Sequence, residues 1–549
     1  MRRTIRRANT EDMAWLKDGE GKYITGRDNL IEYVGKYFHE LYGPRTSERF
    51  DWKWTKSVLE SNADHMIDQG FEELGYNRRI AEQEVREVIS SLPSGKAVGR
   101  DAVPYEFIKH GGENMVLAIT LLIQQIFDEE KIPESWNKLL TISLPKGKKN
   151  PEYLDNKRGI TLSSNVEKIF ERVLINRVSK IVPFTEAQAG ARKGRATHDQ
   201  IFTLKPVLNE RKQRGNATYL AFLDVQKAYD SMWGAAVVKN LWERGVRGKM
   251  WRVLKALNEG KSTQIATRFG LTDDIMVRES LRQGGVASPI EFAALMDQLA
   301  VDLEAEGLHV DYHGIKISCL LLMDDVVLIA DNPKQLQSML DAADRLALRA
   351  HLSYNQTKSK IMVVNGKANN ERIWFLGEHI LEETDRYTYL GETLTNDLRM
   401  TGHLGHLTQR SFGVSSNMFA VASEPTLAKI KIQTLIQLYQ TCWIPAILHG
   451  CETWMMDRSA LERLKALQLN IVKQIFKAPK SALISALLGE TGILPIQYEI
   501  QKRQMMYLYS LLNTTKQALT ILRIMIEEIH SGTWWQHVKE NRMPMSVDP

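Results

Sequence analysis

The segment ISCLLLMDDVVLIAD, residues 317–331, constrains the fold of this chain more than any other stretch. Two short apolar runs flank the adjacent carboxylates Asp324 and Asp325, which indicates two buried strands joined by an acidic turn. Because Asp favours turns, a plain hairpin turn is one interpretation of the pair. A turn between two such strands normally uses Asn-Gly or Asp-Gly, however, so the second carboxylate favours a chemical role.

The stretches around this hairpin predict a mixed α/β or α+β core. Residues 139–149 and 218–224 are short apolar runs that end in polar turn residues, so we expect strands there. Apolar residues at helical spacing predict helices over 167–182, after Asp230, after Pro289 and over 334–351. Strands interleaved with helices in this way are typical of such a core.

Both ends of the chain have helical patterns. Residues 29–43 and 80–92 have the spacing of amphipathic helices, and residues 115–133 are apolar enough to form a buried helix. From Leu398 onward the pattern predicts helices and no strand. We therefore expect the C-terminal third to be an all-α unit.

Composition excludes several classes of protein. The 549 residues include three cysteines, Cys319, Cys442 and Cys451, without the paired spacing of a disulfide framework or a zinc site. No run approaches the roughly 18 apolar residues of a membrane span, and the N-terminus lacks the apolar core of a signal peptide. The formal net charge is +6, so a nucleic-acid partner requires local basic clusters. We expect an intracellular protein that does not cross a membrane.

The aspartates point to metal chemistry. Asp224 ends the apolar run 218–224, and with Asp324 and Asp325 it supplies the carboxylates that a two-metal site requires. Clustered carboxylates repel one another unless cations neutralise them, and hard oxygen ligands suit Mg²⁺. Two metals roughly 3.5–4 Å apart activate a 3′-hydroxyl and stabilise a leaving pyrophosphate.

Three segments resemble the catalytic motifs of a reverse transcriptase of the non-LTR retrotransposon (long interspersed element) type. FLDVQKAYDSMW at 222–233 is similar to the first motif of that family, RQGGVASP at 282–289 to the second, and LMDD at 322–325 to the third. The joint occurrence of ordered motifs is far more specific than any single one.

Further segments extend this resemblance over roughly residues 75–510. NQTKSK at 355–360 and YLGETL at 389–394 resemble the next two motifs, and HGCETW at 449–454 recurs in the thumb region of the family. Upstream, the finger motifs are resembled by SGKAVGRDAVPYEFIK, NKRGITLSSNVEKIFERVLINRV and QAGARKGRATHDQI.

The resemblance implies a right-hand polymerase with an α+β fold, in which a central antiparallel sheet flanked by helices forms fingers and palm and an all-helical thumb follows. The implied order is an N-terminal extension over 1–75, fingers over 76–215, palm over 216–395, thumb over 396–510 and a truncated C-terminal linker over 511–549. The implied reaction is RNA-templated transfer of dNTPs to a primer 3′-end, with Mg²⁺ or Mn²⁺ as cofactor.

Roles in the reaction carry over to matching positions. Asp224, Asp324 and Asp325 match the metal-binding carboxylates of the palm, of which Asp325 is the least direct. Tyr229 matches the aromatic residue beneath the sugar that excludes a 2′-hydroxyl, and a core tyrosine is the alternative. Lys358 matches a lysine able to protonate the leaving pyrophosphate, although a plain surface lysine fits the sequence equally.

Four more residues match positions that bind the nucleotide. Arg158 and Arg192 match finger positions that hold the triphosphate, where the planar guanidinium fork suits phosphate oxygens. Either arginine could instead be a solvated surface charge. Gln283 and Gly284 match the second motif, whose glycines let the backbone approach template and nucleotide closely.

Several positions depart from the family pattern. Leu322 and Met323 replace an aromatic residue and Ala, residues 285–287 replace the middle of the second motif, and Gly159 replaces Pro. None of these changes removes a metal ligand, but a misplacement of about 1 Å can cost around 10²-fold in rate. A catalytically impaired nucleic-acid-binding remnant is therefore the alternative, whereas Tyr229 disfavours a template-dependent RNA polymerase.

The implied partners are an RNA template, a DNA primer or target and dNTPs, in the nucleus or the cytoplasm. The aromatic residues Trp15, Tyr37 and Trp251 can stack on bases or fill the core, and we expect the core. The basic residues expected at the template backbone are Lys146, Lys148, Lys149, Arg192, Lys193 and Arg195.

Members of this family also need a nuclease that nicks DNA. Only about 75 residues precede the first finger motif, which is too few for an ordinary nuclease domain, and no cysteine follows Cys451. We therefore expect a truncated copy that extends a supplied primer and does not cut DNA.

Overall fold

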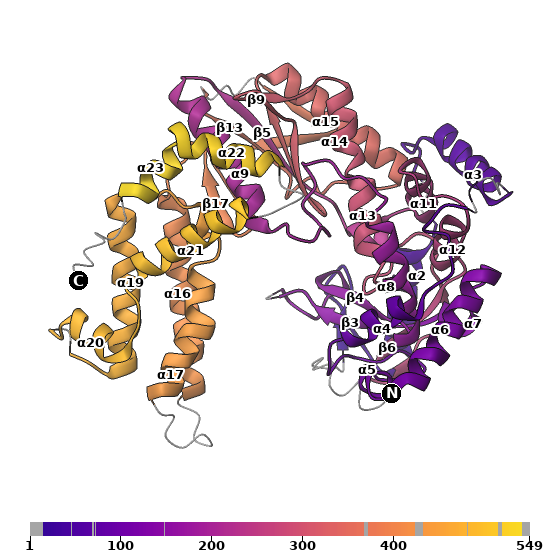
Figure 1. Ribbon diagram of the computed structural model, residues 1–549. Helices are drawn as coiled ribbons and strands as arrows, with labels where there is room; N and C mark the ends of the chain where they lie inside the picture. Colours follow the sequence, from indigo (N-terminus) through magenta and orange to yellow (C-terminus); the bar gives the residue numbers. More distant parts are fainter. Residues whose placement is uncertain are drawn as a thin grey trace. The chain divides into compact units, whose positions relative to one another are not determined.

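The computed structural model describes residues 15–44, 47–67, 71, 73–147, 149–366, 372–422, 432–479, 481–513 and 519–540 (Figure 1). The chain forms two compact units. Unit 1 contains residues 1–185, 224–302 and 342–355, and unit 2 contains residues 186–223, 303–341 and 356–549. Each unit is therefore assembled from three separate stretches of sequence.

The sheet of unit 1 has the strand order β4-β3-β6-β7, and β8 also pairs with β6. Strand β3 (Lys138–Pro145) pairs antiparallel with β4 (Lys157–Leu162) and parallel with β6 (Ser262–Thr267). The short strands β7 (Gly270–Leu271) and β8 (Ile275–Met276) complete it. The Thr141 hydroxyl lies 3.3 Å from that of Thr161 and 2.9 Å from that of Thr263, so hydroxyl groups link the three long strands.

Helices surround the main apolar core of unit 1. They are α4 (Glu82–Ser90), α6 (Gly112–Glu129), α8 (Asn165–Val178), α11 (Gly234–Glu243), α12 (Lys249–Asn258) and α13 (Ser288–Met296). Helix α8 starts where the Ser164 hydroxyl accepts hydrogen bonds from the backbone N–H groups of Val166 and Glu167. Phe170 of α8 and Trp251 of α12 are fully buried in this core.

The N-terminal elements pack on unit 1. The hairpin β1 (Trp15–Lys17) and β2 (Tyr23–Thr25) precedes α2 (Arg27–Tyr42), whose buried residues recur every fourth position from Leu30 to Tyr42. This stripe joins an apolar cluster with Ile265 of β6. Helix α3 (Trp52–Ile67) packs against α11.

The sheet of unit 2 has the order β11-β12-β5-β13-β15-β14. Strands β11 (Cys319–Leu322) and β12 (Asp325–Ala330) form a hairpin, and β5 (Thr218–Asp224) lies between β12 and β13 (Lys360–Val364). Strand β15 (His379–Glu383) pairs with β13, and β14 (Trp374–Leu376) forms the edge of the sheet beyond β15. Every residue of β5 before Asp224 is buried, as expected for a central strand covered on both faces.

Two further hairpins and a long helix complete the sheet region of unit 2. The hairpins are β9 (Val310–Tyr312) with β10 (Ile315–Ile317), and β16 (Arg386–Tyr389) with β17 (Glu392–Thr395). Helix α9 (Thr197–Gln213) packs against β11.

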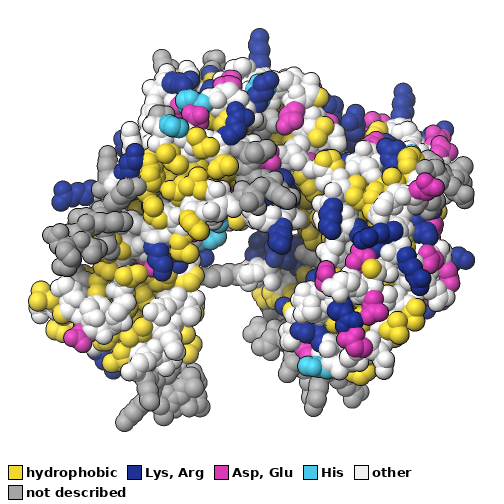
Figure 2. All heavy atoms as spheres, viewed as in Figure 1, with side chains coloured by type: hydrophobic (Ala, Val, Ile, Leu, Met, Phe, Trp, Pro, Cys, Tyr) yellow, Lys and Arg dark blue, Asp and Glu magenta, His cyan; other side chains and the backbone are white. Residues whose placement is uncertain are grey.

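Among the described residues after Thr395 the structure contains helices and no strand. The longer ones are α16 (Thr401–Ala422), α19 (Arg458–Phe476) and α21 (Ile496–Leu512), and α16 runs beside α19 (Figure 1). The shorter helices are α17 (Ile432–Leu438), α18 (Ile444–Ile447), α20 (Ile484–Thr491), α22 (Leu519–Ser531) and α23 (Thr533–Glu540). Figure 2 shows hydrophobic side chains over the C-terminal helices, where Met506 and Tyr509 of α21 are exposed.

The mixed helix-and-sheet core predicted from the sequence is confirmed, including the strands at 139–149 and 218–224 and the acidic hairpin. The prediction of a buried helix over 115–133 is wrong in part. Helix α6 buries one face, while Leu117, Leu121 and Leu122 are 43–54% exposed, because its other face has no helix packed on it among the described residues. No described helix combines the length and the apolar character needed to cross a bilayer.

Candidate functional site

The paired aspartates lie at the tip of the β11–β12 hairpin in unit 2. Leu322 pairs with Asp325, so Met323 and Asp324 form the turn, and Met323 has a φ of 60°. Glycine is the usual residue at positive φ in such a turn, and a larger residue there costs about 1–3 kcal/mol. Asp324 is half-buried and Asp325 is exposed. The hairpin thus presents two carboxylates on a strained turn.

The segment QAGARKG holds this turn from one side within unit 2. The Ala189 N–H donates to the Leu321 carbonyl at 2.8 Å, and the Leu321 N–H donates to the Ala187 carbonyl at 2.9 Å. The buried Gln188 side chain accepts hydrogen bonds from the N–H groups of Gly190 at 2.7 Å and Met323 at 3.4 Å. Two of these bonds join the segment to β11 or to the turn, one joins the preceding Ala187 to β11, and the fourth lies within the segment.

Only glycine fits at position 190. A Cβ atom there would lie 2.6 Å from both the backbone nitrogen and the sulfur of Met323. Contacts of this length do not occur at real Cβ atoms, so the turn would have to move. The close contact with Met323 therefore explains why glycine occupies position 190 of this segment.

Asp224 is the last residue of β5, the strand that neighbours β12 in the sheet. It is half-buried, and its carbonyl accepts a hydrogen bond from the Asn355 N–H at 2.8 Å. Among the described residues the structure gathers no group of three or more His, Cys, Asp or Glu side chains that could hold a metal ion. The convergence of the three aspartates around Mg²⁺ therefore stays a prediction, although their hard oxygen donors suit that ion.

The RQGGVASP segment forms a tight loop before α13 in unit 1. The Gln283 carbonyl accepts a hydrogen bond from the Thr161 N–H of β4 at 2.8 Å. Gly284 has a φ of 123°, and a Cβ atom there would lie 2.6 Å from the Thr161 carbonyl oxygen. Glycine is thus required at 284 by both its backbone conformation and its close approach to β4. Gln283 is half-buried and Gly284 is exposed.

A buried cluster of charges lies behind this loop. Arg282 donates to Glu167 at 2.6 Å and to Glu171, and Lys261 donates to Glu167 at 3.1 Å. The side chains of Glu167 and Glu171 are fully buried on α8. Burial and the neighbouring Arg282 lower the pKa of Lys261 to about 8, although Glu167 opposes the shift.

Tyr229 lies on the short helix α10 (Ala228–Ser231), also in unit 1. Its half-buried ring stacks on Phe292 of α13, with ring centroids 5.1 Å apart, and its carbonyl accepts a hydrogen bond from the Leu281 N–H at 2.8 Å. Tyr229 is therefore tied to the RQGGVASP loop through the residue that precedes it. The partly exposed ring leaves both the sugar-binding and the core interpretation open.

A cluster that the sequence did not reveal holds the segment between Asp224 and Tyr229. Lys227 has a φ of 48°, and its ammonium group lies 2.9 Å from Asp155 and 3.3 Å from the Tyr37 hydroxyl. The Tyr37 hydroxyl donates to Asp155 at 2.9 Å. Burial raises the pKa of Asp155, but the bonds from Lys227 and Tyr37 outweigh it and the net pKa is lowered. Helix α2 thereby contacts the FLDVQKAYDSMW segment.

The other predicted residues differ in exposure. Arg158 on β4 is exposed, and so is Lys358. Arg192 donates to the Gln188 carbonyl at 2.8 Å and lies 3.9 Å from Glu186. The expectation that Arg195 meets the template backbone is wrong in this structure, because its side chain is 1% exposed and pairs with Glu186. Lys148 lies outside the described residues.

The expectations for two aromatic residues have different outcomes. Trp251 is a core residue, whereas Trp15 is 44% exposed on β1, so its assignment to the core is wrong.

Gly159 replaces the family's Pro where a Cβ atom would lie 2.8 Å from the Tyr42 hydroxyl and 3.1 Å from the Phe38 ring. Helix α2 thus occupies the space of a side chain at 159.

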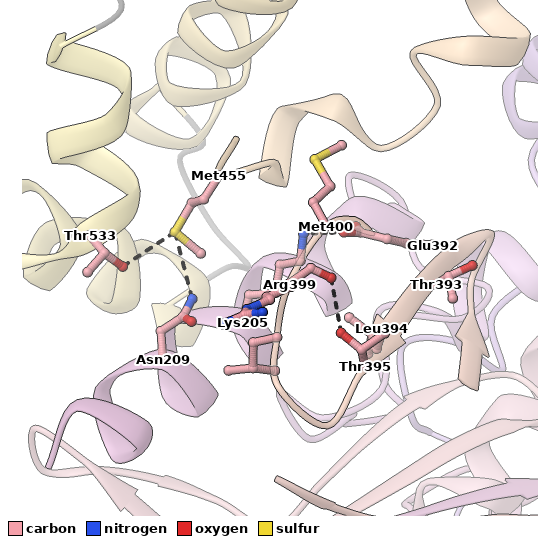
Figure 3. A pocket seen from close by; sticks show the side chains of 11 residues that line it. Lys205, Asn209, Glu392, Thr393, Leu394, Thr395, Arg399, Met400, Met455 and Thr533 are labelled. Carbon is pink, nitrogen blue, oxygen red and sulfur yellow. Dashed lines mark hydrogen bonds and ion pairs between the residues drawn. The ribbon is translucent and has the colours of Figure 1, made fainter. Parts of the chain in front are cut away.

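The HGCETW segment contacts the β16–β17 hairpin within unit 2. Glu392 of the YLGETL segment is buried, pairs with Lys205 of α9 and accepts a hydrogen bond from the Thr453 hydroxyl at 3.2 Å. Lys205 and Glu392 line a pocket of about 160 Å³, with Met455 and Thr533 on another side (Figure 3). The two sequence motifs therefore meet at one buried ion pair.

Comparisons with protein families and with known proteins both find similarity to RNA-directed DNA polymerases. Residues 144–394 match the model of the family described as reverse transcriptase (RNA-dependent DNA polymerase). The chain is 20% identical over 452 residues to the RNA-directed DNA polymerase from mobile element jockey of Drosophila melanogaster, which covers 80% of this chain and 49% of the relative.

Two further relatives are similar to the same degree. The jockey polymerase of Drosophila funebris is 23% identical, over 72% of this chain and 44% of the relative. The retrovirus-related Pol polyprotein from type-1 retrotransposable element R2 of Popillia japonica is 24% identical, over 58% of this chain and 45% of the relative. The chain spans about half the length of the curated relatives that it matches.

Proposed function

We propose that this chain, which carries a domain of the reverse transcriptase family over residues 144–394, is the RNA-directed DNA polymerase of a non-LTR retrotransposon. It extends a primer 3′-end with dNTPs on an RNA template. The observation that carries the proposal is the acidic turn at 324–325 on a buried hairpin, in the same sheet as β5, which ends in Asp224.

The proposed architecture is that of a right-hand polymerase. Fingers extend over residues 76–215, the palm over 216–395 and the thumb over 396–510, between an N-terminal extension over 1–75 and a linker over 511–549. The described helices after Thr395 support the helical thumb, and the sheet that contains β5 and the acidic hairpin supports the palm.

In the proposed mechanism Asp224, Asp324 and Asp325 hold two Mg²⁺ ions, and Mn²⁺ substitutes for them. When bound, these ions acidify the primer hydroxyl and neutralise the leaving pyrophosphate. Asp224 supplies its carboxylate from the end of β5 because β5 neighbours β12, the strand that begins at Asp325. Lys358, which is exposed, protonates the pyrophosphate.

Five residues are proposed to hold the nucleotide. Arg158 and Arg192 bind the triphosphate, and Gln283 and Gly284 approach the base pair through their backbone. Tyr229 lies beneath the sugar and excludes a 2′-hydroxyl. The glycine requirement at 284 supports the role proposed for Gln283 and Gly284, because a glycine leaves bare backbone at an exposed position.

The partners proposed for this polymerase are an RNA template and a DNA primer or target, inside the cell in the nucleus or the cytoplasm. A catalytically impaired remnant that still binds nucleic acid is the second candidate. Met323 favours it, because a methionine at positive φ beside Asp324 strains the turn that must place the carboxylates.

Homopolymer-templated incorporation of dNTPs with Mg²⁺ or Mn²⁺ separates the two candidates. Incorporation by the purified chain that is lost in Asp324→Ala establishes the polymerase. Absence of incorporation with both metals, together with retained binding of primer and template, establishes the remnant. An experimental structure with the Asp224 and Asp324 carboxylates more than about 8 Å apart would refute the shared metal site.

A further inference from the structure

The RQGGVASP loop is attached to helix α8 by a single buried carboxylate. One oxygen of Glu171 accepts hydrogen bonds from the N–H groups of Val286 at 2.5 Å and Ala287 at 3.3 Å. The other oxygen pairs with Arg282 at the start of the loop. Glu171 therefore contacts both ends of the turn that contains Gln283 and Gly284.

We infer that Glu171 is a positioning residue that sets the placement of Gln283 and Gly284 against the incoming nucleotide. The inference rests on the proposed function and adds to it a residue of the NKRGITLSSNVEKIFERVLINRV segment to which the resemblance gave no role. Glu171 itself is fully buried and touches no substrate.

The loop has one attachment on each side. On the side of β4, the Thr161 N–H donates to the Gln283 carbonyl at 2.8 Å, and Gly284 packs against the Thr161 carbonyl. On the side of α8, the Glu171 carboxylate holds the two N–H groups that follow. Because Gly284 and Gly285 lack side chains, these polar attachments and not packing fix the loop.

The neighbouring carboxylate Glu167 shows which part of the cluster acts on the loop. Glu167 also pairs with Arg282 and is equally buried, but its second oxygen has no hydrogen-bond partner among the described residues and none of its bonds reaches a backbone N–H of the loop. A buried ion pair is weak evidence for stability by itself. What distinguishes Glu171 is its pair of hydrogen bonds to the loop backbone.

The charges of the cluster balance around Glu171. Arg282 and Lys261 supply two positive charges, and Glu167 and Glu171 supply two negative charges. Further groups facing the cluster are Glu291, Asn258 and the half-buried Lys168. Replacing Glu171 by a neutral group leaves an excess positive charge in a buried site, which the Arg282 end of the loop must relieve by moving.

The test compares Glu171→Gln and Glu171→Asp with the matched control Glu84→Gln. Glu84 of α4 pairs with Arg177 of α8 at 2.7 Å and accepts a hydrogen bond from the Ala81 N–H, so the control removes an ion pair from α8 without removing a bond to the loop. Steady-state incorporation gives the KM for dNTP, kcat and the affinity for primer and template. Hydrogen exchange of the peptide over 282–290 reports loop order without turnover.

We expect Glu171→Gln to raise the KM for dNTP by roughly 10- to 100-fold, with primer affinity within about threefold of wild type. Glu171→Asp keeps the negative charge that pairs with Arg282, but its shorter side chain places the carboxylate farther from the N–H groups of Val286 and Ala287. We therefore expect this variant to fold normally and to raise the KM for dNTP as well. Exchange over 282–290 accelerates in both variants. Glu84→Gln changes neither the KM nor this exchange, and Glu167→Gln has a smaller effect than Glu171→Gln.

Equal KM values in Glu171→Asp and wild type, or equal exchange over 282–290, overturn the inference. If the wild-type chain incorporates no dNTP at all, the proposed function fails, while the exchange experiment still decides whether Glu171 holds the loop. The two failures are therefore distinguishable.

Discussion

The acidic hairpin in unit 2 and the RQGGVASP loop in unit 1 are supported in opposite ways. Neutral groups hold the hairpin: the Gln188 amide, two backbone bonds to Leu321 and the bare backbone of Gly190. Buried ions hold the loop: Arg282 and the two glutamates of α8. Both supports end at a glycine where an added Cβ atom would lie 2.6 Å from a backbone atom of another segment.

The difference follows from what each element carries. The hairpin already presents two carboxylates, and a charged support beside them would alter their pKa values and compete for a cation. The loop carries no charge beyond Arg282, so ions can support it at no cost to its neighbours. A charged support responds to pH and to loss of one partner, whereas a neutral support responds mainly to shape.

The largest effect is expected at the hairpin tip. Asp324→Ala should reduce dNTP incorporation by about 10³-fold or more, because it removes a proposed metal ligand, and should leave the unfolding midpoint nearly unchanged because Asp324 is only half-buried. Incorporation and thermal unfolding of the same preparation check this. A stable variant with normal incorporation would break the assignment of chemistry to the hairpin.

The two glycines give the next effect and compare the two supports directly. Gly284→Ala should lower kcat/KM roughly 100-fold and destabilise the fold by about 1–3 kcal/mol, since both the φ of 123° and the fixed Thr161 carbonyl oppose it. Gly190→Ala should cost less stability, because Gly190 has no positive φ to oppose a side chain, although the Met323 turn must still move away from the added Cβ atom. Gly95→Ala is the control. Gly95 also has a positive φ, of 73°, but a Cβ atom added there would have no atom within 4 Å, so this substitution should leave kcat/KM unchanged.

The buried charges that support the loop predict that the stability of the fold depends on pH through Glu291. Burial, reinforced by Glu171 and opposed by the Asn258 amide at 2.8 Å, raises the pKa of Glu291 to about 7. The native state therefore favours the protonated form, and the stability from Glu291 is present below its ordinary pKa of 4.5 and lost as pH rises through about 7.

Glu291→Gln removes this loss. The stability of the variant relative to wild type should increase between pH 5 and pH 7.5 by up to a few kcal/mol and then level off at higher pH. Urea unfolding at a series of pH values measures it. A difference that is independent of pH would show that Glu291 is ionised in the native state throughout.

The smallest effect concerns the sugar. Tyr229→Val should raise ribonucleotide incorporation relative to deoxynucleotide by about 10-fold, because it removes the ring that is proposed to block the 2′-hydroxyl. Competition between a dNTP and its NTP on one template measures the ratio. Unchanged discrimination would assign Tyr229 to the packing against Phe292 alone.

The sequence predicted elements whose signal is local. Strand β5 and the acidic hairpin follow from short apolar runs that end in polar residues, and α2 follows from a buried stripe at every fourth position. The periodicity of α6 was less informative, because an apolar face indicates burial only where another element packs on it.

The supports of the site could not be predicted in this way. Glu171 and Val286 are 115 positions apart, and Gln188 and Met323 are 135 apart, so no spacing in the sequence relates them. Glu171 has the appearance of an ordinary helix glutamate in EKIFERVL. Its partners are set by how α8 packs on the loop, which is a property of the tertiary structure.

The alternation of the chain between the two units has a consequence for its synthesis. Six stretches alternate between the units, so the chain passes from one to the other five times, and unit 1 receives its last stretch at residues 342–355. A ribosome must therefore translate beyond Asn355 before unit 1 can close, although 185 of its residues emerge first. Neither unit can be expressed as one continuous fragment, and a chain interrupted before Asn355 leaves both unfinished.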